Sequence, residues 1–352
     1  MFETLPQTDN DFYSAILTNS LAAIKINRYT DNFDSYRFNF DGIDRQFVFN
    51  VVDHAFYFDW FFRNYKALFA AYSNLNDERS RRLFLHLIAF RLGGHLSVKL
   101  PVSFSDKSAD YEQYRKSVKS TPSELSVSGM FGKLNHFDFS YRGRRYLVDC
   151  VRLDSYLFRG QYFYSSNGVE IAPKSGDILI DGGACTGDTA AIFSEVVGPR
   201  GKVYSFDPVS VHLEILEYNA RQFPTKNVVV MPYGLSDTNI DAAPIVLNGY
   251  TPGFSAKGQK VPLRTIDHLV DTSAIERIDF IKLDVEGSEL AAIRGARKSI
   301  EKFRPQLAIS LYHKPNDLFD IVLYIRENFP FYSLHIDHYT IHSEETVLYC
   351  TT

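Results

Sequence analysis

A glycine-rich turn carries the clearest chemical signal in the sequence. It reads Asp181-Gly182-Gly183-Ala184-Cys185-Thr186-Gly187 and lies between the apolar stretch 177–180 and the helix-compatible stretch 188–197. Glycines let the backbone turn sharply and let a ligand approach it, and the N-terminus of the next helix offers free N–H groups. The glycine spacing is not the G-x-G-x-x-G of dinucleotide-binding turns. Hydride transfer from a nicotinamide cofactor is therefore disfavoured.

Acidic residues follow two other strand-like segments. Asp207, followed by Pro208, comes after 202–206, at the distance from the glycine turn, about twenty residues, where doubly wound nucleotide-binding domains place an acid on ribose hydroxyls. The alternative role for Asp207 is an N-cap. Asp284 and Glu286 follow 278–283, at the carboxyl edge where open α/β sheets bind ligands. A third polar strand end, Ser236-Asp237, predicts an adenine site beside Leu235, with a turn cap as its alternative.

The elements that position these residues alternate between strand and helix patterns. The predicted strands are 177–180, 202–206, 227–231, 279–283 and 306–310. Such alternation is typical of a parallel sheet with helices on both faces. The last two apolar segments, 331–336 and 345–350, have a connection too short for a parallel crossover. They are therefore predicted to form an antiparallel hairpin at the edge of the sheet.

The first part of the chain is predicted to be rich in helix. Helices are expected over 12–26, 53–72 and 77–92, the last with Asn76 as its N-cap. Asp41-Gly42 predicts a hairpin turn, and 137–163 predicts a hairpin or meander around Gly143. The polar segment 103–128 is interpreted as a connection or flap. We expect an α-rich domain over 1–128, acting as a lid, an acceptor-selecting or an interaction domain, and a second domain over 129–352 with a β lead-in to about 165.

Composition narrows the function classes. The 352 residues suit two domains, and a formal charge of −4 provides no overall basic field for nucleic acid or anionic lipid. Three widely spaced cysteines suggest neither a disulfide framework nor a cysteine-based zinc site. The sequence shows no signal peptide and no apolar run of about 18 residues. A cytoplasmic protein without a membrane span is expected.

Several segments together resemble the FkbM family of S-adenosylmethionine (SAM)-dependent methyltransferases. The matching segments are 181–187, 204–208, 233–237, 261–269 and 278–296, with 304–321 similar to one branch of the family. The pattern KLDVEGxEL followed by RGA is highly specific to it. The resemblance covers about half of the chain, roughly 160–349. One departure is Cys185, where many members have Asn; we interpret it as a small loop residue rather than a nucleophile.

The resemblance implies a class I methyltransferase fold, a Rossmann-like α/β sheet, and SAM as the cofactor. Members mostly methylate hydroxyls of sugars or natural products, so O-methylation of a small-molecule or glycan acceptor is expected. The alternatives are methylation of a nitrogen or carbon acceptor and a nucleotide-binding module without catalysis. No nucleic-acid partner is expected, and the oligomeric state, a homo-oligomer included, stays open.

The strand ends and the resemblance together give an expected role to each site residue. The expected cofactor-binding residues are Asp181, Gly182, Gly183, Thr186, Gly187, Asp207, Pro208, Ser236, Asp237 and Asp284. His313 is the first candidate for the base, since imidazole titrates near physiological pH, and a structural histidine is its alternative. Glu286 is expected to bind the acceptor or support the site. A divalent metal on Asp284, Glu286, His313 and Asp317 is the less favoured alternative, because no ligand spacing requires it; no metal is predicted. His338 and Tyr339 either rim the pocket or belong to an edge strand.

Overall fold

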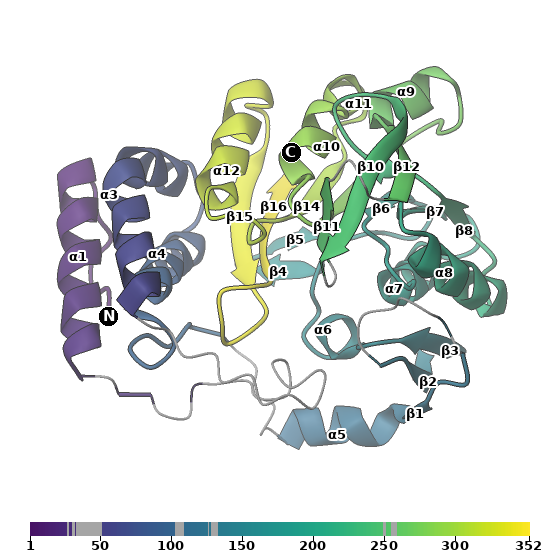
Figure 1. Ribbon diagram of the computed structural model, residues 1–352, viewed down its shortest axis with the longest axis horizontal. Helices are drawn as coiled ribbons and strands as arrows, with labels where there is room; N and C mark the ends of the chain where they lie inside the picture. Colours follow the sequence, from purple (N-terminus) through teal and green to yellow (C-terminus); the bar gives the residue numbers. More distant parts are fainter. Residues whose placement is uncertain are drawn as a thin grey trace. The chain divides into compact units, whose positions relative to one another are not determined.

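The chain forms two compact units in the computed structural model (Figure 1). The structure describes residues 1–26, 28–29, 32, 51–102, 109–125, 127, 133–248, 251–254 and 259–352. One unit, called here the helical unit, comprises Met1–Ser103 and Leu311–Cys350, and the other, the α/β unit, comprises Phe104–Ser310 and Thr351–Thr352. The predicted domain boundaries at 128 and 165 stay a prediction, since the two units are defined by contacts rather than by chain order. The predicted hairpin around Asp41-Gly42 lies outside the described residues.

The helical unit is built on the three predicted helices. These are α1 (Asp9–Ile26), α3 (Val51–Ser73) and α4 (Glu78–Gly93), and the later elements of the unit are α12 (Asp317–Asn328), β15 (Ser333–His338) and β16 (Thr346–Thr351). Trp60 of α3 donates from Nε1 to Asn316 Oδ1 at 2.8 Å, and Arg91 of α4 donates to the Pro315 carbonyl at 2.7 Å. The start of α12 is thus bonded to α3 and to α4. Trp60 and Phe61 of α3 are buried: Trp60 packs against Phe319, and Phe61 packs against Tyr13.

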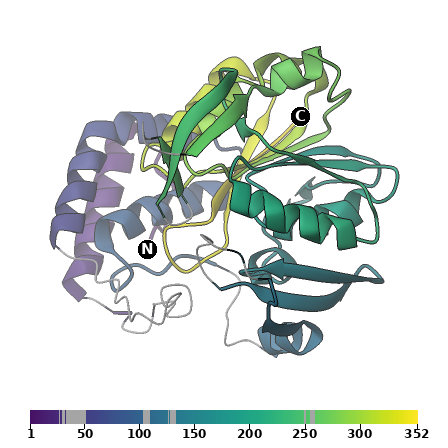
Figure 2. The same ribbon diagram turned by 45° about the vertical axis from the view of Figure 1, so that its right-hand side comes forward.

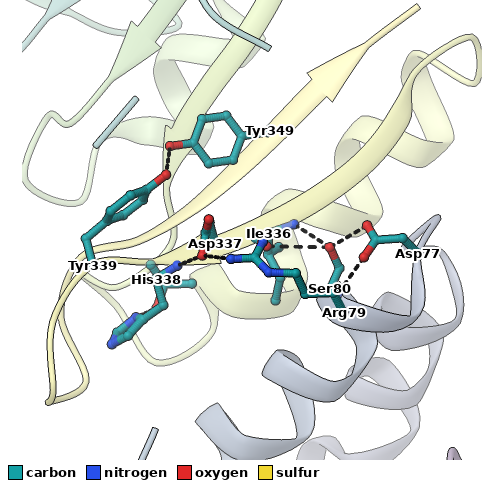
Figure 3. A network of polar contacts seen from close by, with 9 residues as sticks. Asp77, Arg79, Ser80, Ile336, Asp337, His338, Tyr339 and Tyr349 are labelled. Atoms are coloured by element: carbon teal, nitrogen blue, oxygen red, sulfur yellow. Dashed lines mark hydrogen bonds and ion pairs between the residues drawn. The ribbon is translucent and has the colours of Figure 1, made fainter. Parts of the chain in front are cut away.

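The N-terminus of α4 is joined to β15 by side-chain hydrogen bonds (Figure 3). Asp77 caps the helix by accepting from the Ser80 N–H at 2.8 Å, and Ser80 Oγ accepts from the Ile336 N–H at 3.0 Å. The prediction that Asn76 is the N-cap is wrong by one residue. Asn76 instead accepts from the Leu334 N–H at 2.7 Å, so its side chain serves the strand.

The segment between β15 and β16 is closed by buried polar contacts. His338 Nδ1 lies 2.8 Å from Thr346 Oγ1 and its Nε2 lies 2.7 Å from the His342 carbonyl oxygen. The hydroxyls of Tyr339 and Tyr349 lie 2.7 Å apart (Figure 3). Both His338 and Tyr339 are buried. These contacts fit the edge-strand alternative for the two residues.

The α/β unit contains all five predicted parallel strands. Their order is β14 (Gln306–Ser310), β13 (Phe280–Leu283), β6 (Ile178–Gly182), β7 (Lys202–Phe206) and β8 (Val228–Met231). Figures 1 and 2 show α7 (Asp188–Val197) and α8 (Ser210–Gln222) on one side of these strands, and α10 (Glu289–Arg294) and α11 (Arg297–Phe303) on the other. The predicted fold class, a Rossmann-like class I methyltransferase sheet, is confirmed. Central β6 pairs Asp181 with Ser205 on one side and Lys282 on the other.

The described residues also form three smaller sheets, which were only partly predicted. The predicted hairpin around Gly143 is formed by β2 (Asn135–Tyr141) and β3 (Arg144–Cys150), which pair antiparallel. Within the segment 103–128, interpreted as a connection or flap, residues 109–122 form α5 (Ala109–Ser117) and β1 (Lys119–Pro122), the neighbour of β2. Its role as a connection or flap stays a prediction. After β8, the chain adds β9 (Gly234–Leu235), β10 (Ile240–Asn248), β11 (Thr251–Phe254) and β12 (Gln259–Arg264), followed by α9 (Ile266–Asp271). The remaining elements are α6 (Asp154–Leu157), β4 (Tyr164–Ser166) and β5 (Val169–Ile171).

Two whole-chain features bear on the composition argument. The three cysteines are free thiols. Within the described ranges, no helix combines the length and apolar character that crossing a bilayer requires.

Asp77 gives a pH-dependent test of the joint between α4 and β15. Burial favours its neutral form, but hydrogen bonds from His335 and Ser80 outweigh burial and lower the pKa of Asp77 to about 2. The stability that Asp77 contributes is therefore complete above about pH 4 and is lost as the pH falls through about 2. Asp77→Ala should lower the free energy of unfolding by about 1–2 kcal/mol at pH 7, and Asp77→Asn by less, because Asn still caps.

Urea unfolding measures the effect. The control is Asp59→Ala, which removes an exposed ion pair with Arg63 and should change stability by less than about 0.5 kcal/mol. Equal losses in the two Ala variants would contradict the capping role of Asp77.

Candidate functional site

The glycine turn follows β6 and leaves no room for side chains at its glycines. A Cβ built on Gly183, where φ is +76°, would lie 1.8 Å from the carbonyl oxygen of Asp284. At Gly187, where φ is +91°, it would lie 2.8 Å from Leu216. Both positions combine a left-handed backbone with close packing, which only glycine satisfies. The turn therefore presses directly against the end of β13.

The backbone of the turn is held by its neighbours. The N–H groups of Gly183 and Ala184 both donate to the Phe206 carbonyl at 2.9 Å, and that of Cys185 donates to Asp207 Oδ2 at 3.1 Å. Buried Asn219 donates to the Thr186 carbonyl at 2.7 Å. Since each buried backbone group that lacks a partner destabilises a fold, these bonds fix the conformation of the turn.

A buried lysine completes the support of the turn. Lys282 of β13 is 1% exposed and donates from Nζ to the carbonyls of Gly182 and Gly183 at 3.0 and 2.9 Å. Its Nζ lies 3.1 Å from Oδ1 of Asp181, whose Oδ2 accepts from Thr189 Oγ1 at 2.8 Å. Burial opposes the charge on Lys282, but Asp181, Asp284 and Asp188 outweigh it and raise its pKa. The ammonium therefore stays charged inside the protein.

Two more carboxylates, those of Asp284 and Asp188, act on the Lys282 ammonium besides Asp181. Asp284 is half-buried and accepts from the Tyr162 hydroxyl at 2.8 Å. Asp188, also half-buried, accepts from the Thr189 N–H at 2.8 Å. Burial, together with the charges of Asp181 and Asp284, raises the pKa of Asp188 to about 7 against the opposing effects of Thr189 and Lys282. The end of β6 and β13 is thus an acidic environment.

Asp207 is already engaged by the protein. It is 5% exposed, and its Oδ1 accepts from the Val209 N–H at 2.8 Å, while Oδ2 accepts from Cys185. His212 Nδ1 lies 3.2 and 3.3 Å from the two oxygens. Burial opposes the charged imidazole, but Cys185 and Asp207 outweigh it and raise the pKa of His212 to about 11. The carboxylate therefore fixes both the turn and the start of α8, and its predicted ribose contact stays a prediction.

The predicted adenine segment around Ser236-Asp237 contacts the turn through its apolar residue Leu235. A Cβ built on Gly182 would lie 2.9 Å from Leu235 Cδ1, and one built on Gly234 would lie 3.5 Å from Pro208 Cβ. Ser236 is half-buried, and Asp237 is exposed. Leu235 and Pro208 are thus packed at the site, whereas Asp237 lies at the surface.

Residues 181–329 match the family model described as the methyltransferase FkbM domain. They belong to the FkbM methyltransferase family. A similar curated protein is hexuronic acid methyltransferase AglP from Haloferax volcanii, which is 30% identical over 131 residues, or 36% of this chain and 52% of that protein. The crystal structure of methyltransferase FkbM from Methylobacillus flagellatus has a TM-score of 0.54 and 22% identity, over 83% of this chain and 60% of that one. The alignment with AglP therefore spans about half the length of that relative.

The DVEG segment of the FkbM domain forms a strained turn. Glu286 and Gly287 have φ of +54° and +92°. Fully buried Glu289 accepts from the N–H groups of Val285 at 2.8 Å and Gly287 at 3.4 Å. Glu286 itself is half-buried, and its predicted role toward the acceptor stays a prediction.

The predicted base belongs to the helical unit. His313 packs against the Tyr312 ring with centroids 4.2 Å apart, and Asp317 accepts from the Lys314 N–H at 2.8 Å. Asp284 and Glu286 belong to the α/β unit. The role of His313 as a base and the alternative metal set therefore stay predictions.

Sequence reasoning missed four side chains that shape the site. Tyr162, Lys282, His212 and Asn219 act through contacts with residues 5 to 122 positions away. Lys282 and Glu289 lie inside the KLDVEGxEL pattern, which was the available signal for them. Nothing in the local sequence marks Tyr162 or Asn219.

Gly183 gives a test of the close packing at the turn. Gly183→Ala should destabilise the protein by on the order of 3–5 kcal/mol, because the added methyl meets the Asp284 carbonyl. Gly143→Ala is the matched control, since Gly143 has φ of +85° and nothing within 4 Å of a built Cβ. That control should cost only about 1 kcal/mol of backbone strain. Denaturant unfolding compares them, and equal losses would refute the close approach.

Proposed function

We propose that the protein is a SAM-dependent methyltransferase that methylates a hydroxyl group of a sugar or sugar-containing acceptor. The observation that carries the proposal is the acidic end of β6 and β13, where the charges of Asp181, Asp188 and Asp284 act on the buried ammonium of Lys282. SAM carries a positive sulfonium and, when protonated, a positive amino group. A partly desolvated excess of carboxylates favours such a cationic ligand over a dinucleotide, whose phosphates are anionic.

Residues around the turn are proposed to bind the remaining parts of this cofactor. Asp284 is proposed to bind the amino-acid portion, and Asp207 to bind a ribose hydroxyl. Leu235 offers an apolar surface for adenine, with Pro208 close to its strand. Asp207 has three donors already, and since a carboxylate accepts about four hydrogen bonds, it is expected to bind one hydroxyl rather than two. Asp181, which is fully buried beside Lys282, is proposed to support the turn; its predicted contact with the cofactor stays a prediction.

The sugar acceptor is supported by the relatives. AglP is named as a hexuronic acid methyltransferase, and the family resemblance implies hydroxyl acceptors. Because the alignment covers 52% of AglP, the acceptor of this protein remains our proposal. An amine or carbon acceptor and a module without catalysis are the competing outcomes of the tests below.

The chemistry requires little beyond positioning and proton removal. SAM supplies a methyl group on a positively charged sulfur, which an in-line attack transfers. The chain must hold the acceptor oxygen in line with that methyl group and accept the hydroxyl proton. We propose that an imidazole nitrogen of His313 takes this proton, and that Glu286 accepts a hydrogen bond from the acceptor.

Calorimetric titration with SAM, and separately with NAD, tests the cofactor. Saturable SAM binding without an NAD response is expected. Asp207→Ala should weaken SAM binding by about 1.5–3 kcal/mol, the range of a hydrogen bond to a charged group. Glu214→Gln is the control, because Glu214 is exposed on α8 and should leave SAM affinity unchanged. NAD binding in place of SAM would refute the proposal.

Methyl transfer to a panel of hexuronic acids, hexosides and amines tests the acceptor and the base. His313→Gln should lower turnover on the best hydroxyl acceptor by about 10²–10⁴-fold with nearly unchanged SAM affinity. The exposed His268 of α9 provides the control His268→Gln, which should retain full turnover. Unaltered turnover in His313→Gln would end its candidacy. Transfer to amines alone would favour the alternative acceptor class, and SAM binding without any transfer would favour a module without catalysis.

A further inference from the structure

The three carboxylates at the acidic end of β6 and β13 are not equivalent. Asp181 is fully buried and is matched by Lys282 and Thr189. Asp284 accepts from the Tyr162 hydroxyl and holds the position at which we expect the cofactor's amino-acid portion. Asp188 accepts one hydrogen bond, from the Thr189 N–H to Oδ1. Among the described residues its Oδ2 has no hydrogen-bond donor.

The Lys282 ammonium makes its hydrogen bonds and its ion pair with groups other than Asp188. Lys282 Nζ has three protein partners, the carbonyls of Gly182 and Gly183 and the carboxylate of Asp181, at 2.9–3.1 Å. Among the described residues, no hydrogen bond or ion pair joins Lys282 to Asp188. The charged groups acting on Asp188 are Lys282, Asp181 and Asp284, and it acts in turn on the thiols of Cys150 and Cys185. Two of those three groups repel a negative charge at this position.

We propose that Asp188 is a specificity-determining residue, which makes the cofactor site prefer the sulfonium of SAM to the neutral thioether of the product S-adenosylhomocysteine (SAH). The two ligands differ by a methyl group and by one positive charge on sulfur, and they share every group that Asp207, Leu235 and Asp284 are proposed to contact. An uncompensated carboxylate beside the turn interacts with the charge that distinguishes them. This inference rests on the proposed SAM-dependent function.

The preference is expected to depend on pH. Burial with Asp181 and Asp284 raises the pKa of Asp188 to about 7, so the free protein exchanges its proton near neutral pH. A cation bound nearby favours the ionised form, and binding of SAM below about pH 7 should therefore release a proton. The preference for SAM over SAH should accordingly increase as the pH rises from about 6 to about 8.

Titration of the full chain with SAM and with SAH, at about pH 6 and about pH 8, tests the proposal. Asp188→Asn keeps the shape and removes the charge. At the higher pH it should lower the ratio of the SAH to the SAM dissociation constant by about tenfold, and it should reduce the pH dependence of that ratio. Ionisation of the ligand's own amino group is common to both proteins and cancels in their comparison. The control Glu214→Gln, an exposed acid on α8, should leave the ratio unchanged.

A second readout needs no ligand. Because its folded pKa lies above its unfolded value of 3.8, Asp188 loses favourable interactions as the pH rises from about 4 through about 7. Thermal unfolding should show Asp188→Asn to be more stable than the wild type at about pH 8 and similar to it at about pH 4. Equal stability at both pH values would overturn the uncompensated charge on which the proposal depends.

The outcomes distinguish the role of Asp188 from the proposed SAM-dependent function. A loss confined to SAM supports the proposal. An equal loss for SAM and SAH, or no loss, overturns the role of Asp188 while leaving the SAM-dependent function intact. Absence of SAM binding in the wild type refutes the proposed function, and the inference with it.

Discussion

The candidate site depends on the contacts that the buried ammonium of Lys282 makes. It joins β13 to the end of β6 through two carbonyls and the carboxylate of Asp181. Burying this pair carries a desolvation penalty that only a complete set of partners offsets, and loss of either partner would leave an uncompensated charge. A glycine turn has little conformational preference of its own. Lys282 supplies from the neighbouring strand the restraint that the turn lacks, and the contact of Gly183 with the Asp284 carbonyl excludes other arrangements.

The difference between local patterns and contacts with distant residues explains what the sequence could and could not predict. The five parallel strands are short apolar runs ended by polar residues, and such local patterns predicted each of them within two residues. The turn and the acids at the strand ends followed from residue type and spacing. Tyr162 and Asn219 were missed because their roles arise from contacts with Asp284 and Thr186, far along the chain. Periodicity reports which face of an element is buried, and it carries no information on which distant group a polar side chain meets.

A similar limit applies to the organisation of the chain. The segment from α12 to β16 continues the methyltransferase pattern in sequence, yet its residues up to Cys350 cluster with the N-terminal helices. The reason lies in specific side chains. Asp77 caps α4, while Asn76 and Ser80 accept from backbone N–H groups of β15. Trp60 and Arg91 bond the start of α12. The position of the α4 cap, missed by one residue, was decided by these contacts, since Asn76 and Asp77 are equally good caps by residue type.

Cys185 shows how contacts can substitute for residue preference. Its φ of +44° is left-handed, a conformation that Asn, the residue in many family members, tolerates better than most side chains. Cysteine has no such preference, so its conformation must come from its neighbours. Its N–H is bonded to Asp207, whose carboxylate also accepts from Val209 and faces His212, and the next carbonyl is bonded to Asn219. Because these partners fix the backbone on both sides of the residue, the turn holds this left-handed conformation without Asn.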